Sequence, residues 1–295
     1  SVAGVDSRML LRDPERRSWT IDRIELPGVR IQVGRLGSGN IASGQIDGDG
    51  CMLYLPLTPG IEYQGNGDRI DRDAVFVMDP AAEFCITTKV SHDWCAVTIP
   101  SDQLAHYKIE SSSRSCRVTQ PNPVALHQFR DVVGNIMATA AQCPEFETSP
   151  AAALAASTLL GLVAPGVGQR LKQTEQTTGR PKLSRADIIR RSLGSLEEFR
   201  GNRPNVAELA SQSGVSERTL RTTFQQYFGM GPSRYLQLRQ LHDVRRSLRS
   251  ADPDQESVAQ VLTAHGVWSF GRFASQYLEL FGELPSVTLR STARS

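Results

Sequence analysis

A pattern of residues that occurs twice in the last third of the chain constrains the fold more than any other feature. In the first copy, Ala210, Gly214 and Leu220 meet the needs of a helix-turn-helix: a small residue where two helices cross, a glycine able to adopt a positive φ, and an apolar anchor for the second helix. Ser216 is a suitable N-cap for that second helix. The pattern therefore predicts two short helices joined by a tight turn.

The second copy has the same elements in the same order. Gly266 lies in its predicted turn, Ser269 is a possible N-cap, and a buried stripe follows, made by Phe273, Tyr277 and Phe281. The copies also end alike, because Phe228-Gly229 precedes Pro232-Ser233 and Phe281-Gly282 precedes Pro285-Ser286. Between them, residues 232–250 have the apolar spacing of one helix. A helix of about 17 of these residues is roughly 25 Å long and can hold two recognition helices about one DNA turn, ~34 Å, apart.

The charge of the chain is unevenly distributed, although its net value is only +2. Residues 1–179 carry 16 basic and 20 acidic side chains, whereas residues 180–295 carry 17 and 11, which gives −4 and +6. An acidic part joined to a basic part is typical of a protein in which only one part meets phosphate groups.

The duplicated residues resemble the AraC/XylS family of bacterial transcription regulators. The matching positions are Gly214, Val215, Ser216, Leu220, Phe224, Phe228, Gly229, Pro232 and Tyr235, and then Gly266, Val267, Ser269, Phe273, Phe281, Gly282 and Pro285. The resemblance implies a seven-helix domain over residues 185–295, with two helix-turn-helix units in adjacent major grooves of promoter DNA. It also implies contact with RNA polymerase, and an N-terminal cupin-like barrel that binds a small effector beside helices that form a homodimer.

The first predicted recognition helix presents a polar face, made by Glu217, Arg218, Arg221, Thr222 and Gln225. Arg218, Arg221 and Thr222 stand where family members reach base edges. An arginine can bind guanine O6 and N7 in a bidentate pair worth about 1 to 3 kcal/mol of discrimination. The alternative is that these arginines are merely solvated.

The second copy departs from the family on the corresponding face. Phe270, Gly271, Ala274 and Ser275 stand where a basic or amide residue is common, and Arg272 remains as a phosphate contact. We therefore expect the first copy to supply most of the base readout and the second mainly to position the domain, with Phe270, Arg272 and Ser275 facing the DNA.

The N-terminal part has the pattern of an antiparallel β structure followed by helices. Turn residues separate short β segments, which are Trp19–Leu26, Val29–Leu36, Cys51–Leu57, Ala74–Met78, Phe84–Val90 and Trp94–Ile99. Helical spacing follows over Pro123–Gln142 and over Pro150–Val163. The apolar stripe of Pro123–Gln142 is our candidate dimer contact, and the alternative is that it packs against its own barrel. Pro150–Val163 is expected to be buried, against the β domain or against another copy. The predicted fold is α+β: a cupin-like effector and dimerisation domain over residues 1–164, a linker over 165–184, and the all-α domain over 185–295.

Several functional classes are not expected. The three histidines before the linker, His92, His106 and His127, never form His-x-His, and nucleophile elbows, Walker loops and dinucleotide fingerprints are absent from the sequence. We therefore predict no enzyme, no catalytic residues and no metal or redox cofactor. Five cysteines without a CxxC pair, and no apolar stretch of about 18 residues, favour a cytoplasmic protein without a membrane partner.

One motif suggests an effector. Arg12, Arg16 and Arg17 precede the first predicted strand, and their spacing resembles the RxxxR motif by which PilZ domains hold cyclic di-GMP. Asn40 and Ser43 lie where the second PilZ motif would follow, although with a different spacing. Paired guanidinium groups suit phosphates and guanine edges. The expected protein is a ligand-responsive regulator, an activator; the alternatives are that the β domain senses another small molecule, of sugar or aromatic type, or only dimerises.

Overall fold

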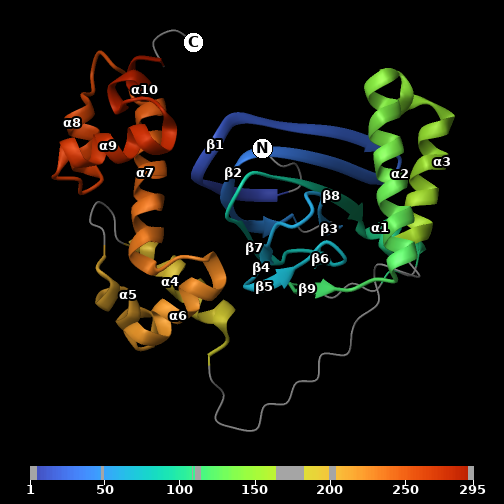
Figure 1. Cartoon of the computed structure of the whole chain (residues 1–295), viewed down its shortest axis with the longest axis horizontal. Coiled ribbons are helices and arrows are strands. Elements are labelled where there is room, and N and C mark those ends of the chain that lie inside the picture. The colour runs from blue at the N-terminus through green and yellow to red at the C-terminus, as the bar shows by residue number, and fades with distance from the viewer. Residues whose placement is uncertain are drawn as a thin grey trace. The chain divides into compact units, whose positions relative to one another are not determined.

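A computed structural model describes residues 5–47, 50–107, 109, 114–163, 183–198 and 204–291 of the chain (Figure 1). Contacts divide the chain into two compact units. Unit 1 comprises Ser1–Met9 and Glu15–Thr177, and unit 2 comprises Leu10–Pro14 and Thr178–Ser295. The predicted linker, residues 165–184, falls almost wholly outside the described residues, so the domain boundaries remain a prediction.

Unit 1 is built on one nine-stranded sheet. Its strands are β1 (Val5–Leu26), β2 (Val29–Ile46), β3 (Gly50–Pro56), β4 (Tyr63–Gly65), β5 (Asp68–Ile70), β6 (Val75–Met78), β7 (Glu83–Thr88), β8 (His92–Pro100) and β9 (Cys116–Thr119). The order is β5-β4-β7-β2-β8-β3-β6-β9, with antiparallel ladders such as β2 with β8 and β3 with β6, and β1 pairs with β2. Because the end strands β5 and β9 also contact each other, the sheet forms a nearly closed barrel, as predicted.

Side chains of alternate residues supply two separate cores. On β3, Met52 and Tyr54 belong to the core inside the barrel, whereas Cys51, Leu53 and Leu55 pack outward. Helices α2 (Pro123–Gln142) and α3 (Pro150–Leu162) lie side by side over the outer face, and their apolar residues complete the second core (Figure 1). Both faces of β3 are therefore buried, which explains its continuous apolar sequence. The short helices α1 (Ser101–His106) and η1 (Phe146–Thr148) border this core.

Strands β1 and β2 are longer than the sequence predicted, and β4, β5 and β9 were not predicted at all. The glycines of residues 34–44 indicate turns in the sequence, yet they lie in the middle of β2. At Gly34 a Cβ atom would overlap the Trp94 ring, and at Gly39 it would overlap the Lys89 carbonyl. These glycines allow neighbouring groups to approach β2 closely, so they are strand residues and not turn residues.

Unit 2 contains seven helices within its described residues, as predicted. They are α4 (Arg185–Glu198), α5 (Val206–Ser213), α6 (Glu217–Phe228), α7 (Pro232–Ser250), α8 (Val258–Ala264), α9 (Phe270–Phe281) and α10 (Pro285–Ser291). The long helix α7 joins the α4–α6 group to the α8–α10 group (Figure 1). Phe228 and Tyr235 stack with ring centroids 4.4 Å apart, which fixes α6 against the start of α7.

Candidate nucleic-acid interface and ligand pocket

The turn between α5 and α6 has the predicted geometry. Gly214 ends α5 with φ 71°, a conformation that glycine adopts without steric cost, and the Val215 amide donates to the Ala210 carbonyl at 3.1 Å. Ser216 is the N-cap of α6, where its hydroxyl accepts from the Thr219 amide at 3.1 Å. The buried hydroxyl groups of Ser192 and Ser213 lie 2.7 Å apart and tie α4 to α5. The orientation of α6 is therefore fixed by backbone and buried polar contacts.

The five residues predicted to face DNA all lie on the exposed side of α6: Glu217, Arg218, Arg221, Thr222 and Gln225. The opposite side packs inward through Leu220, Phe224 and Phe228. Arg221 pairs with Glu217 on the same helix, with Nη2 3.1 Å from Oε2. The Thr222 hydroxyl donates to the Arg218 carbonyl at 3.0 Å, so its lone pairs, not its proton, are available to a ligand.

The second turn is tied to the connecting helix α7 by His265. Its carbonyl accepts from Gln240 Nε2 at 2.8 Å, and its Nε2 lies 2.8 Å from the Ser247 hydroxyl. Burial lowers the pKa of His265, so the ring is neutral in this contact at pH 7. The second helix-turn-helix is thus held directly by the helix that also carries the first.

The second recognition helix, α9, also buries one face, through Phe273, Tyr277 and Phe281. The predicted DNA-facing residues Phe270, Arg272 and Ser275 are exposed. Ser269 is the N-cap residue, but its side chain makes no cap hydrogen bond, unlike Ser216.

The residues predicted to face DNA did not include one exposed aromatic residue of this unit. Trp268 is 76% exposed and has no counterpart in the first turn, where Ser216 directly follows Val215. The signal was present in the sequence, because the buried anchor lies six residues after Gly214 but seven residues after Gly266. That comparison locates one extra residue between Val267 and Ser269.

The residues predicted to bind the effector, as far as the structure describes them, lie in different units of the chain. Arg12 belongs to unit 2, where its guanidinium donates to the Phe228 carbonyl at 3.0 Å and to the Gly229 carbonyl at 3.4 Å, at the C-terminal end of α6. It lies within β1 and not before the first strand. Asn40 and Ser43 lie on β2 in unit 1. The side chains of Arg16 and Arg17 lie outside the described residues.

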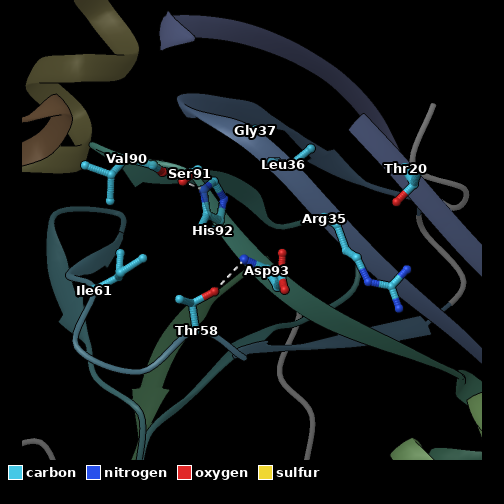
Figure 2. A pocket seen from close by; sticks show the side chains of 10 residues that line it. All are labelled: Thr20, Arg35, Leu36, Gly37, Thr58, Ile61, Val90, Ser91, His92 and Asp93. Atoms are coloured by element: carbon cyan, nitrogen blue, oxygen red, sulfur yellow. Dashed lines mark hydrogen bonds between the residues drawn. The ribbon is translucent and has the colours of Figure 1, made fainter. Parts of the chain in front are cut away.

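Unit 1 contains a cavity of about 480 Å³ (Figure 2). Its walls come from β1, β2, β8 and nearby loops, and its lining residues are Thr20, Arg35, Leu36, Gly37, Thr58, Ile61, Val90, Ser91, His92 and Asp93. Arg35 and Asp93 are directly opposed in the β2–β8 ladder. Figure 2 shows their polar groups on one side of the cavity, with Ile61 and Val90 on the other. The cavity therefore combines a charged end with an apolar end.

Hydrogen bonds and one ion pair order the polar end. Arg35 pairs with Asp22 of β1, with Nη1 2.6 Å from Oδ2. The Asp93 amide donates to the Thr58 hydroxyl at 2.7 Å, and the Tyr63 hydroxyl donates to the Asp93 carbonyl at 2.7 Å. The Asp93 backbone is thus held from two sides.

His92 forms a buried wall of the cavity. Its Nδ1 lies 3.0 Å from the Thr88 hydroxyl, which also contacts Asn40 Oδ1 at 3.3 Å. Burial lowers the pKa of His92, so the ring is neutral at pH 7. Asn40 therefore supports the cavity wall from behind instead of lining the cavity.

The described ranges contain no group of three or more His, Cys, Asp or Glu residues placed to hold a metal ion. None of the helices in these ranges combines the length and the apolar character needed to cross a bilayer.

Matches to known proteins include the C-terminal part of the chain. Residues 209–291 match the family model of a helix-turn-helix domain. A probable thc operon regulatory protein of Rhodococcus erythropolis is 35% identical over 111 residues, which are 38% of this chain and 33% of that protein. The XylDLEGF operon transcriptional activator 1 of Pseudomonas putida is 28% identical over 174 residues, which are 56% of this chain and 50% of the activator.

A crystal structure of a transcriptional regulator of the AraC-type DNA-binding domain class, from Chromobacterium violaceum, is 26% identical in sequence. The match covers 36% of this chain and 93% of that chain, with a TM-score of 0.34. The chain spans half or less of the length of the two curated relatives described above. In its C-terminal part, the chain is therefore similar to AraC/XylS-type transcription regulators.

Proposed function

We propose that the protein is a sequence-specific DNA-binding transcription regulator, an activator, whose β unit controls it in response to a small molecule. The observation that carries the proposal is the pair of helix-turn-helix units held by one helix, α7, each with one face of its recognition helix buried and the other exposed. A 19-residue helix is roughly 28 Å long, which suits two recognition helices in successive major grooves. The bound form is a homodimer on promoter DNA that contacts RNA polymerase.

The two recognition helices have different tasks. Arg218 and Arg221 bind guanine edges in the major groove, and Thr222 and Gln225 accept or donate at neighbouring bases. Glu217 holds Arg221 in the free protein and releases it to a base on binding. The exposed face of α9 offers one cation, Arg272, which binds phosphate and positions the domain.

The effector site is the cavity at Arg35 and Asp93. Its volume lies within the usual range for small-molecule pockets, about 300 to 1,000 Å³. Arg35 would bind an anionic or hydrogen-bonding group, and Ile61 and Val90 would cover an apolar end. These features favour a small amphiphilic acid over cyclic di-GMP. The ion pair of Arg35 with Asp22 is exposed and can open to a ligand, whereas Arg12 is buried and donates to the carbonyls at the end of α6.

The alternative function is a constitutive regulator whose β unit only dimerises. Val124 on α2 and Leu154 on α3 are 66% and 70% exposed, which favours these helices as the contact between two copies in either case. Sedimentation of the full chain tests the contact. A monomer under all conditions, with and without DNA, would contradict it.

The deciding experiment measures DNA binding of the full chain. A duplex is selected from a randomised pool, and its affinity is measured while small aromatic and aliphatic carboxylic acids, or cyclic di-GMP, are titrated. We expect an acid to change DNA affinity and Arg35→Ala to abolish the change. Arg23→Ala is the control, because Arg23 is an exposed arginine paired with Glu25 outside the cavity. A response to cyclic di-GMP that is lost in Arg12→Ala/Arg16→Ala would replace the carboxylic acid as effector, and no response to any ligand would favour the constitutive alternative.

A further inference from the structure

The turn before α9 exposes an aromatic surface. Trp268 has the highest exposed fraction, 76%, among the large apolar side chains of the described residues, and Phe270 is 40% exposed. The neighbouring Val267 is buried at 6% exposure, so the backbone of the turn is fixed by packing. The extra residue of this turn thus carries its side chain into solvent beside the start of α9.

The exposed stripe that continues along α9 is apolar as well. Counted back from Phe228-Gly229, α6 presents Glu217, Arg221 and Gln225 at four-residue spacing. Counted back from Phe281-Gly282, the same three positions of α9 hold Phe270, Ala274 and Leu278. Phe270 and Leu278 are 40% and 44% exposed, and Ala274 is partly exposed. The corresponding face is therefore charged or polar on α6 and apolar on α9.

We propose that Trp268 and Phe270 are specificity residues that recognise thymine, by packing against its C5-methyl group in the major groove. This inference rests on the proposed DNA-binding function. Thymine is the base that presents an apolar group in that groove, whereas the edges of G·C pairs present hydrogen-bonding groups. Apolar rings satisfy no donor or acceptor of either base pair, so the thymine methyl group is the feature of the groove edge that this surface can contact favourably.

The remaining residues of the helix start fit a close approach to DNA. Gly271 is exposed, and a Cβ atom there would meet open space, so the first turn of α9 presents bare backbone to a ligand. Arg272 follows and supplies a cation for the phosphates. A surface for another protein is less well matched, because the apolar stripe occupies the positions of the base-reading face of α6.

The test uses the duplex that the full chain selects from a randomised pool. Each thymine is replaced in turn by uracil, which removes only the methyl group. Removing one buried methyl contact should weaken binding by about fourfold. We expect one or two such positions, located in the half-site whose preference survives in Arg218→Ala. No uracil effect in that half-site of the wild-type complex would overturn the inference without any variant being needed.

Two variants connect the effect to the side chains. Trp268→Ala and Phe270→Ala should bind the thymine duplex about threefold to tenfold more weakly and should lose the uracil effect at one position each. Val287→Ala is the matched control, because Val287 is an apolar residue of α10 that is 42% exposed. An unchanged uracil effect in Trp268→Ala and Phe270→Ala would overturn the inference. So would unchanged DNA binding with reduced transcription, which would assign the surface to a protein partner.

The proposed DNA-binding function and the inference about Trp268 and Phe270 can be refuted separately. If the full chain selects no sequence at all, the proposed DNA-binding function is wrong. If it selects a sequence whose methyl groups have no effect on affinity, the proposed function stands and the inference about Trp268 and Phe270 is wrong.

Discussion

Replacing Arg218 and Arg221 tests how the first recognition helix selects its sequence. Each arginine that binds a guanine bidentately contributes about 1 to 3 kcal/mol of discrimination, or roughly 5-fold to 140-fold. Arg221 must first leave Glu217, and an exposed ion pair of this kind at i,i+4 spacing is worth about 0.3 to 0.5 kcal/mol. Arg221→Ala should therefore cost about twofold less than Arg218→Ala, and Glu217→Gln should raise affinity slightly.

The assay is competition between the selected duplex and variants with one guanine replaced, at two salt concentrations. Arg190→Ala is the matched control, because Arg190 is also exposed and paired with an acid of its own helix, Asp187, at 2.5 Å. A lost phosphate contact weakens binding to all sequences and lowers the salt slope by about one, whereas a lost base contact removes preference at one position. If Arg218→Ala and Arg221→Ala behave as lost phosphate contacts, our reasoning about α6 is wrong.

Three further predictions concern stability and reactivity. Gly214 has a φ of 71°, so Gly214→Ala should destabilise unit 2 by about 1 to 2 kcal/mol in urea unfolding. Gly231 has a φ of −72° and a Cβ atom there would meet open space, so Gly231→Ala should be nearly neutral. Equal effects of the two substitutions would contradict the role of the positive φ. Burial lowers the pKa of His242 to about 4, so below pH 6.5 the unfolded chain binds a proton that the folded chain does not. The free energy of unfolding should therefore fall by on the order of 1 to 2 kcal/mol by pH 5. His242→Gln should reduce this fall, and a variant with the same pH profile as the wild type would refute the prediction. Cys143 is exposed, whereas burial raises the pKa of Cys51, Cys85 and Cys95 to about 12, so a thiol reagent should show a fast phase that Cys143→Ser removes.

The C-terminal unit was predictable because its signals are local. Glycines with positive φ, the Ser216 cap and apolar residues at helical spacing each determine structure within a few residues, and the structure contains them as predicted, including α7 over Pro232–Ser250. The exception was Trp268. An inserted residue becomes visible only when the two copies are compared position by position.

The fold class of the β unit was predicted from the sequence, but the position of its cavity was not. Gly34 and Gly39 look like turn residues until the groups that approach them from β8 and the end of β7 are known. The cavity residues Arg35, Thr58 and Asp93 come from distant segments, and no short motif links them. The RxxxR spacing does not reveal the partners of Arg12 either, because its guanidinium donates to carbonyl groups whose positions depend on the fold of unit 2.

Methylation interference on the selected duplex shows where the recognition helices bind, because it reports which guanine N7 atoms in the major groove contact the protein. Two recognition helices held by α7 predict two contact regions on one side of the duplex, about 10 base pairs apart. Guanine interference should be strong in the region read by Arg218 and Arg221 and weak in the other. Equally strong guanine interference in both regions, or a strong and a weak region without the one-turn spacing, would contradict binding by two helix-turn-helix units in these roles.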